Sequence, residues 1–423
     1  MYRDAEEFID LLKTLDDHPY SPARDLFDTK ADLIVARAPG RLDLMGGIAD
    51  YSGSHVLEFP IAEATFVALQ LSPKRELNIV TLLDDEPHHS SFSMSLSALD
   101  GPVEYEAARQ FFTNSWAAYV AGVFLVLMRE RNISFESGAN ILISSRVPPG
   151  KGVSSSAALE VAVMQAVTVA FDIEIDGRDK ALLCQRVENL VVGAPCGVMD
   201  QMTSVFGERD RLLLLLCQPA ELKRMITLPP QLMLWGIDSG IRHSVSGSDY
   251  GSVRAGAFMG TRIIAELKPD FSAGGYLANI SPAEFESEYV TRLPDAVRLP
   301  TAHPIYENVR VQRFVELLER NEGYDELGEL MYESHRSYTA LGLNSAGTDL
   351  IVELVRREAG LFGAKITGGG SGGTVAVLGD ERSHAAIQRV IASYAKETGH
   401  QPYVFSGSSD GTLVFGHLRL QAG

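Results

Sequence analysis

Hydrophobic and polar positions alternate in short runs along the first third of the chain, and each run ends at proline, glycine or charged residues. Period-two runs rich in β-branched and aromatic residues predict strands at residues 33–37, 56–61, 65–71, 76–82 and 138–144. Phe8, Leu11, Leu12 and Leu15 instead share one helical face, so an amphipathic helix is expected before the first strand. The N-terminal half is therefore predicted to build a sheet.

Apolar runs that are longer than a strand predict the helices. Residues 116–129 leave almost no polar face, which indicates a helix buried on most sides. Residues 157–171 and 179–192 predict two more helices, and the second of them carries Glu188.

The second half has its own pattern. Strands of a second sheet are predicted at residues 212–217, 231–237 and 373–378, and helices at residues 253–266, 309–320 and 347–358. Residues 268–304 are rich in Pro, Gly, Ser and Asp, so a surface excursion is expected there. Since 423 residues are more than one core usually serves, two domains are expected.

Composition narrows the classes of function. The chain has 55 acidic and 37 basic residues and a net charge of −18, which disfavours broad binding to nucleic acid or anionic membranes. Its three cysteines (Cys184, Cys196 and Cys217) lack metal-ligand spacing and are expected to be reduced and buried. No signal peptide is recognisable, and no run approaches the roughly 18 apolar residues of a membrane span. A cytoplasmic enzyme is expected, in which local dipoles and a metal ion would hold any phosphorylated ligand.

A Gly/Ser loop between the predicted strand 138–144 and the predicted helix 157–171 is the strongest candidate for chemistry. Its residues are Pro149, Gly150, Lys151, Gly152, Val153, Ser154, Ser155 and Ser156. Glycines let the main chain approach a ligand, and the free N–H groups and dipole of a helix N-terminus attract anions, so a triphosphate is the natural occupant. An alternative stays open, because serine often only caps a helix and the run is not the common P-loop.

Other polar and aromatic residues are candidates for ligand contacts. Arg41, Asp43, Asp50 and Tyr51 lie in a glycine-punctuated segment, where charged residues usually line a site or close a turn.

Three more features each allow two interpretations. Asp200 follows a Gly/Pro break and would suit a substrate hydroxyl or cap the next helix. Trp116 would pack in the core, which spacing alone favours, or face an adenine. The glycine-rich run at residues 367–373 is expected to form a tight loop against a ligand or against the first domain.

Six segments resemble one family, in the same order along the chain. Residues 41–51, 148–158 and 365–373 resemble the three motifs of the GHMP kinases. Residues 116–123, 196–201 and 242–250 resemble the galactokinases and L-arabinokinases within that superfamily. The resemblance covers nearly the whole chain. It implies a two-domain α+β fold, with a ribosomal protein S5 domain 2-like N-terminal domain, a ferredoxin-like C-terminal domain and the active site in the cleft between them.

The resemblance also suggests where the domains divide. Residues 1–205 would form the first domain and residues 206–402 the second. In the superfamily the last segment often returns to the first domain, so residues 403–423 are expected to return there as a strand, with residues 411–417 as the candidate.

The implied activity is ATP- and Mg²⁺-dependent transfer of a phosphoryl group to the anomeric hydroxyl of a monosaccharide, by a monomer or weak homo-oligomer. The implied catalytic residues are Asp200 and Arg41. The implied contacts are Trp116 beside adenine, residues 149–156 around the phosphates, Ser156 and Glu188 on Mg²⁺, and Arg41, Gly47, Ile48, Asp50, Gly197, Asp200 and Tyr250 around the sugar. Whether Asp200 takes the proton or only orients the hydroxyl stays open, because a nearby arginine would make the carboxylate a weak base.

Two positions depart from the galactokinase pattern. Galactokinases have Glu-His where this chain has Gly47 and Ile48. The resemblance implies that those two side chains bind the 6-hydroxyl of galactose. Without them the hydroxyl would face hydrocarbon, at about 1–3 kcal/mol for each lost partner. L-Arabinose has the same ring hydroxyls but no such arm, so conversion of L-arabinose to β-L-arabinose 1-phosphate is predicted.

The rival activities differ in class. Galactokinase activity, giving α-D-galactose 1-phosphate, is the nearest. A non-catalytic regulator that binds sugar and ATP would tend to lose part of the phosphate loop, which is present here together with Glu188 and Asp200. A mevalonate-type kinase is disfavoured by residues 196–201. Lys151, where many relatives have a small residue, would either add charge beside the phosphates or point into solvent.

Overall fold

The computed structural model describes residues 2–82, 89–101, 103–112, 115–241, 248–268, 271, 275–370 and 373–421. Residues 242–247 of one family-like segment and residues 371–372 of the glycine-rich run lie outside the described residues.

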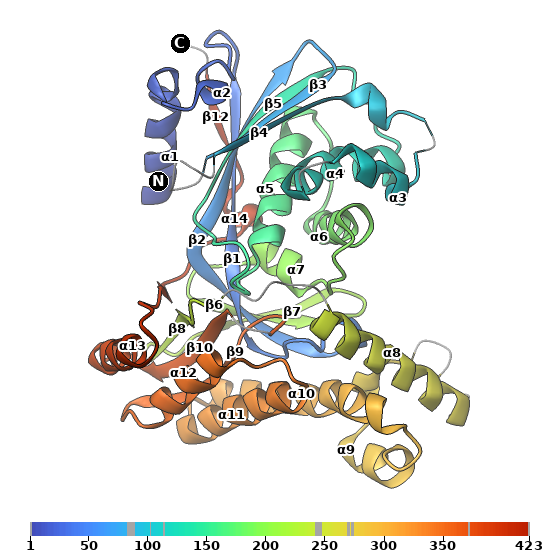
Figure 1. Ribbon diagram of the computed structural model, residues 1–423, viewed down its shortest axis with the longest axis vertical. Coiled ribbons are helices and arrows are strands. Elements are labelled where there is room, and N and C mark those ends of the chain that lie inside the picture. Colours follow the sequence, from blue (N-terminus) through green and yellow to red (C-terminus); the bar gives the residue numbers. More distant parts are fainter. Residues whose placement is uncertain are drawn as a thin grey trace.

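A long antiparallel pair of strands, β1 (Leu33–Met45) and β2 (His55–Ser72), runs through the middle of the molecule (Figure 1). The sequence predicted shorter strands that end before Pro39 and Ala62. Neither position ends its strand. At Pro39 the register shifts before Arg41, and this irregularity accommodates a residue without an N–H group. Arg41 is therefore carried by a strand rather than by a loop.

The first sheet contains this pair and has the order β12-β1-β2-β5-β3-β4 among the described residues, and in addition β6 pairs with β2 and β7 pairs with β6. The other strands are β3 (Glu76–Leu82), β4 (Ser90–Ser95), β5 (Gly138–Ser145), β6 (Arg211–Leu216), β7 (Glu221–Thr227) and β12 (Leu418–Leu420). The prediction that residues 212–217 belong to the second sheet is wrong. β2 is long enough to pair with β6 at its start, where His55 lies opposite Leu216.

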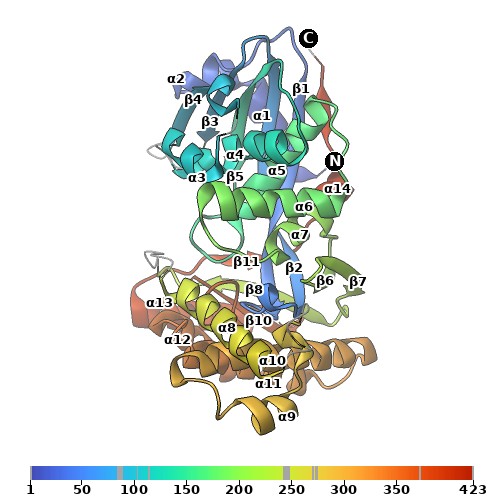
Figure 2. The same cartoon turned by 90° about the vertical axis from the view of Figure 1, so that its right-hand side faces the viewer.

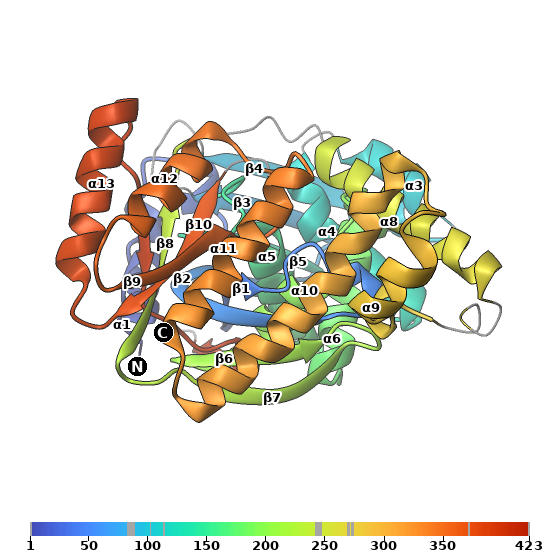
Figure 3. The same cartoon turned by 90° about the horizontal axis from the view of Figure 1, so that it is seen from below.

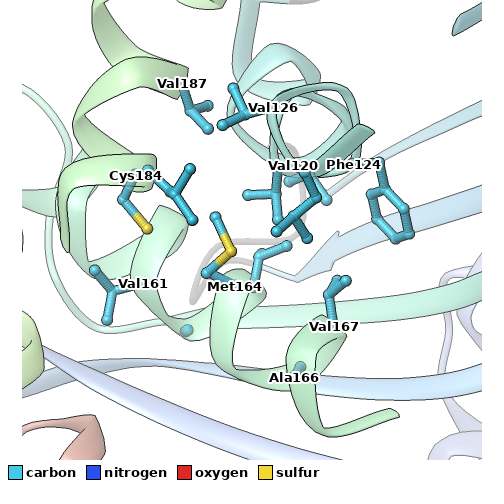
Figure 4. Close-up of a cluster of buried hydrophobic side chains, with 14 of the residues drawn as sticks. Val120, Phe124, Val126, Val161, Met164, Ala166, Val167, Cys184 and Val187 are labelled. Carbon is cyan, nitrogen blue, oxygen red and sulfur yellow. The ribbon is translucent and has the colours of Figure 1, made fainter. Parts of the chain in front are cut away.

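Helices cover both faces of the first sheet. On one face lie α4 (Ser115–Glu130), α5 (Ser155–Ala170), α6 (Gly177–Arg186) and α7 (Met199–Phe206) (Figure 2). Their core includes Val120, Phe124, Met164 and Val187 (Figure 4). On the other face α1 (Arg3–Lys13) stacks Phe8 on Phe66, which confirms the predicted amphipathic helix.

The helix predicted at residues 179–192 changes its winding partway. α6 is followed by η6 (Val187–Val192), a π-helical segment that carries Glu188. Such segments are rare and often occur at functional sites.

The second sheet has the antiparallel order β11-β8-β10-β9. Its strands are β8 (Leu232–Asp238), β9 (Leu361–Ile366), β10 (Thr374–Asp380) and β11 (Val404–Ser406). The helices α11 (Tyr324–Ala340), α12 (Ala346–Arg356) and α13 (His384–Thr398) pack against it, and α8 (Ser248–Leu267) packs on α10 (Asp295–Arg320) farther from the sheet (Figure 3). Leu42 and Phe59 of the long strand pair share a core with Phe314 and Leu378, so the two sheets meet at the lower end of that pair.

Two predictions for the second half are wrong in part. The expected surface excursion ends at α10, which begins at Asp295 and contains Pro300 and Pro304. Interior prolines usually break a helix, but Pro300 is packed so closely on α8 that a Cβ on Gly256 would lie 2.9 Å from its ring. Residues 411–417 are not a strand: α14 (Thr412–Phe415) occupies them, and the chain returns to β1 through β12.

No helix among the described residues combines the length and the apolar character needed to span a membrane.

Candidate active site

The Gly/Ser loop joins β5 to α5 and has an open outer side. Gly150, Gly152 and Ser154 have φ of +73°, +73° and +62°, in the left-handed region. Left-handed residues placed among right-handed ones turn successive N–H groups toward one side, which makes a concavity for anions. A Cβ on Gly150 would meet nothing within 4 Å, so this side can receive a ligand.

Ser154 decides between the two interpretations of the serines. It is the N-cap residue of α5, yet its side chain makes no capping hydrogen bond. Its Oγ is buried and has no hydrogen-bond partner within the described part of the chain. The capping explanation is therefore wrong for Ser154. An unpaired buried hydroxyl costs about 1–3 kcal/mol, a cost that an anion in the loop would remove.

Arg41 connects this loop to the predicted catalytic carboxylate. Its Nε and Nη2 donate to Asp200 Oδ1 at 2.9 and 2.7 Å, and its Nη1 donates to the carbonyl of Gly152 at 2.6 Å. Nε also lies 3.2 Å from Glu58 Oε2. Burial by itself would lower the pKa of Arg41, but the carboxylates of Asp200, Glu58 and Asp43 outweigh it and raise that pKa. The guanidinium is therefore a fixed positive charge between the loop and Asp200.

Asp200 lies in the first turn of α7, and the N-cap of that helix is Val198. The interpretation of Asp200 as the cap of this helix is therefore wrong. Its carboxylate turns to Arg41 instead, while the helix dipole at this end favours a negative charge.

A cavity of about 130 Å³ opens beside Asp200. It is lined by Arg41, Ile48, Asp50, Pro195, Cys196, Gly197, Met199, Asp200, Tyr250 and Gly369. The structure thus brings together every residue predicted around the sugar except Gly47. An engineered cavity of about 150 Å³ in another protein holds benzene, so this one suits a single six-membered ring. A larger cavity, of about 460 Å³ beside Tyr2 and Arg209, shares no lining residue with it.

Asp50 lines this cavity although it is buried. It is 3% exposed, and a Cβ on Gly197 would lie 1.7 Å from its Oδ2, so only glycine fits there. Burial and then the charge of Asp200 raise the pKa of Asp50 to about 7, while Arg41 and backbone N–H groups oppose the shift. Near neutral pH the carboxyl can therefore either donate or accept a hydrogen bond from a hydroxyl.

Glu188 and Ser156, the predicted metal ligands, are in contact. Burial and the charge of Asp200 raise the pKa of Glu188 to about 7, although hydrogen bonds from Ser156, Cys196 and Gln201 act to lower it. Within the described ranges no three His, Cys, Asp or Glu side chains form a metal cage. Mg²⁺ commonly binds one or two carboxylates and completes its shell with water and phosphate oxygens. Ser156 and Glu188 therefore fit a Mg²⁺ ion that is shared with a nucleotide.

Sequence reasoning missed several buried polar residues around this centre. Gln201 Nε2 donates to Glu188 at 2.8 Å and to Glu160 at 3.3 Å. Glu160 is four residues after Ser156, a spacing that places both on one side of α5 and could have indicated it. Glu58 lies opposite Asp43 in the β1–β2 register. A charged residue within an otherwise apolar strand could have indicated it. Burial and the charge of Asp43 raise the pKa of Glu58 well above its usual range.

The turn at residues 46–48 contains two neighbouring positions, Gly47 and Ile48, that were both predicted to contact the sugar but differ in the structure. Ile48 has a φ of +51°, is 1% exposed and lines the cavity. A β-branched residue rarely adopts this conformation, which signals strain at the site. A Cβ on Gly47 would instead lie 2.0 Å from Asp43 Oδ2 and 2.1 Å from the hydroxyl of Tyr338. Position 47 therefore points away from the cavity, and the prediction that Gly47 lines it is wrong.

Distant side chains hold this turn. Gly46 donates its N–H to Glu307 Oε1 at 3.1 Å, and His303 Nε2 lies 3.0 Å from the carbonyl of Gly47. Burial lowers the pKa of His303, so a neutral ring donates to the carbonyl. Both side chains come from α10, in the second half of the chain.

The glycine-rich run presses on the loop as predicted. A Cβ on Gly368 would lie 2.8 Å from the carbonyl of Gly152 and 3.1 Å from Arg41 Nη2. Just before the run, Lys365 Nζ pairs with Asp43 Oδ2 at 2.7 Å, and neither side chain is exposed. This pair fixes β9 to β1 directly behind the turn at residues 46–48.

Two residues predicted around the nucleotide make contacts within the protein. Trp116 on α4 packs, partly buried, against the core of the first sheet, and its place beside adenine stays a prediction. Lys151 is 9% exposed and its Nζ lies 2.7 Å from Asp238 Oδ2 at the end of β8. The interpretation of Lys151 as an outward-pointing, solvated lysine is therefore wrong.

The chain matches known proteins along most of its length. Residues 118–208 match the N-terminal domain of the GHMP kinases, residues 314–397 match their C-terminal domain, and residues 24–71 match the galactokinase galactose-binding signature. A galactokinase of Chloroflexus aggregans is 33% identical over 90% of this chain and 93% of its own length. The chain belongs to the GHMP kinase family. Within it, this protein is a sugar kinase of the galactokinase and L-arabinokinase type.

Two further comparisons describe its relatives. An L-arabinokinase of Arabidopsis thaliana is 43% identical over 94% of this chain, which spans 48%, about half, of that protein's length. A crystal structure of Lactococcus lactis galactokinase complexed with galactose superimposes with a TM-score of 0.83, covering 95% of this chain and 99% of that one, at 21% identity. A mevalonate kinase superimposes with a TM-score of 0.58. These structural likenesses agree in the fold.

Proposed function

We propose that this sugar kinase transfers the γ-phosphoryl group of ATP to the anomeric hydroxyl of L-arabinose and so forms β-L-arabinose 1-phosphate. The observation that carries the proposal is Ile48, whose buried side chain forms part of the wall of the small cavity beside Asp200. A branched hydrocarbon there offers no hydrogen bond to an exocyclic hydroxyl, and the cavity has little room for the arm that carries one. The L-arabinokinase similarity supports the same choice.

Asp200 and Arg41 would act on the hydroxyl that attacks the phosphorus. Both hydrogen bonds from Arg41 reach Oδ1 of Asp200, so Oδ2 is the oxygen proposed to accept the hydrogen bond of the anomeric hydroxyl. A carboxylate held in this way orients the hydroxyl and can take its proton as the new bond forms. The fixed charge of Arg41 would stabilise the negative charge on the attacking and transferred oxygens.

The Gly/Ser loop would hold the triphosphate through its N–H groups and the hydroxyl of Ser154. Ser156 and Glu188 would hold Mg²⁺, which when bound neutralises phosphate charge and aligns the transferred group. Asp50, Tyr250 and the backbone at Gly197 would contact the ring hydroxyls. Phosphoryl transfer depends mainly on such alignment and charge stabilisation, and needs little other chemistry from the protein.

Galactokinase activity is the second candidate, because the galactose-binding signature and the galactokinase relatives favour it. Three sugars separate the two in one assay of ATP-dependent phosphorylation: L-arabinose, D-galactose and D-fucose, which keeps the exocyclic carbon but lacks its hydroxyl. We expect kcat/KM to be highest for L-arabinose. Rejection of galactose but not of D-fucose would assign the discrimination to the unpaired hydroxyl, and rejection of both would assign it to space. A preference for galactose would refute the proposal, and binding of sugar and ATP without product would favour a regulator.

A further inference from the structure

Lys151 and Asp238 form a buried ion pair between the Gly/Ser loop and the second sheet. The Lys151 and Asp238 side chains are only 10% and 8% exposed, and their Nζ and Oδ2 atoms are 2.7 Å apart. Lys151 belongs to the loop, whereas Asp238 is the last residue of β8, a strand paired on both sides. The pair thus joins a loop of the first half of the molecule to a rigid position in the second.

The surroundings leave both side chains little freedom to rearrange. Asp238 Oδ1 accepts the N–H of Gly240 at 3.0 Å, so Oδ2 is directed at Lys151. On the loop side, a Cβ on Gly373 would lie 2.6 Å from the carbonyl of Lys151. One neighbour of Lys151 is fixed as well, because the carbonyl of Gly152 accepts from Arg41 at 2.6 Å. Lys151 is therefore held by its main chain and its side chain at once.

Two roles for the lysine can be compared. An ammonium beside the loop could bind phosphate directly, and Asp238 would then compete with the nucleotide for it. Alternatively, Asp238 could be the intended partner, so that the ammonium holds the loop in the shape that receives phosphate. Near-complete burial of both groups favours the second role, since separating a buried pair leaves two desolvated charges without partners.

We propose that the Lys151–Asp238 pair is a latch that fixes the Gly/Ser loop against the end of β8, and that Lys151 is a positioning residue acting through Asp238. The inference rests on the proposed function, in which this loop receives the triphosphate. It predicts that both members of the pair contribute equally to nucleotide affinity and hardly at all to sugar affinity.

The test is a double-mutant cycle with Lys151→Met and Asp238→Asn, read by calorimetric titration with ADP and Mg²⁺ and, separately, with L-arabinose. We expect each single variant to weaken ADP binding by about tenfold, as a displaced loop would. The double variant should bind no worse than the single ones, because the second change removes a charge that the first left unpaired. Lys223→Met is the matched control, since Lys223 pairs with Glu221 at an exposed position on β7.

The two roles of Lys151, as a phosphate ligand or as a positioning residue, predict opposite effects of Asp238→Asn on ADP affinity. If Lys151 were a phosphate ligand, Asp238→Asn would leave ADP affinity unchanged or improve it, and that outcome would overturn the latch. Exchanging the residues, Lys151→Asp with Asp238→Lys, should restore affinity and keeps the test valid if a single variant folds poorly.

A second readout does not need a nucleotide. Hydrogen exchange should show faster exchange of the amides at residues 150–154 in Asp238→Asn than in the parent protein. Failure of the parent protein to bind ADP would refute the proposed function, whereas unchanged loop exchange in Asp238→Asn would refute the latch.

Discussion

The phosphate side and the sugar side of the candidate site are built in different ways. The Gly/Ser loop has left-handed conformations at three of its own residues, Gly150, Gly152 and Ser154, and one buried ion pair, Lys151–Asp238, joins it to the second sheet. The turn at residues 46–48 is held by Glu307 and His303, which are 261 and 256 residues away along the chain from Gly46 and Gly47. The contrast suggests that the loop combines a locally encoded conformation with an ion pair to the second half, whereas the turn that lines the sugar cavity depends on how the two halves of the molecule pack.

Asp200 lies where the two sides meet, so its removal should have the largest effect. We expect Asp200→Asn to lower kcat by about 10²- to 10⁴-fold, the usual contribution of a positioned acid or base. Affinity for ADP should change little, because the loop and its contact with Arg41 remain. Phosphate-transfer assays and calorimetric titration measure the two quantities, and Glu208→Gln, a change at a partly exposed carboxylate that pairs with Arg211, serves as the control. Retention of most of the turnover would remove Asp200 from the chemical step.

Substitution within the turn sharpens the contrast between its two neighbours. Ile48→Ala should shift the ratio of kcat/KM for galactose over L-arabinose by roughly 10- to 100-fold toward galactose, because it enlarges the cavity and uncovers polar neighbours. Gly47→Ala should not shift that ratio, since its Cβ would collide with Asp43 and Tyr338 instead of entering the cavity. It should lower stability and activity toward both sugars alike. An equal change of specificity in the two variants would show that position 47 acts on the sugar after all.

A pair of more distant changes tests whether the two sides are independent. His303→Ala removes the hydrogen bond to the carbonyl of Gly47 and should raise KM for the sugar by about tenfold, with KM for ATP nearly unchanged. Ser154→Ala should do the reverse, because it removes a buried hydroxyl of the Gly/Ser loop that has no partner among the described residues and that we propose binds phosphate. Steady-state kinetics with each substrate varied in turn gives both constants. Parallel changes in both constants for either variant would mean that the two sides are coupled.

The same contrast explains what the sequence could predict. The strand, loop and helix around the Gly/Ser run follow from local periodicity and glycine positions, and Asp50, Asp200 and Tyr250 were expected around the sugar from the family resemblance. Glu160 and Glu58 were missed because their importance arises from burial beside other carboxylates, which no local pattern reveals. Lys151 shows the limit most clearly. Both interpretations of it assumed that its partner was phosphate or solvent, and the partner is a residue at the end of another sheet.

The prediction of which sheet contains residues 212–217 failed for a related reason. Residues 212–217 are as apolar as a strand of either sheet, and only the unusual length of β2 decides that β6 joins the first one. The continuous helix through Pro300 depends in the same way on its packing against α8, which overrides the local preference of proline.

The last prediction concerns Asp50 and the dependence of stability on pH. In the folded protein its carboxyl keeps a proton up to about pH 7, whereas the ordinary pKa of the group is 3.8. Between these values the folded state binds more protons than the unfolded state, so this group makes stability fall as the pH rises through that window and has no further effect above it. The side chain of Asp50→Asn cannot ionise. The free energy of unfolding of this variant should therefore increase relative to that of the parent protein as the pH rises from 5 to 8. A gain of about 1.4 kcal/mol corresponds to each pKa unit. Urea unfolding at both pH values measures it, with Asp295→Asn, a change at a fully solvated carboxylate, as the control. An equal difference between variant and parent at both pH values would mean that Asp50 is already ionised at pH 5, and that the sugar side of the cavity carries a permanent negative charge.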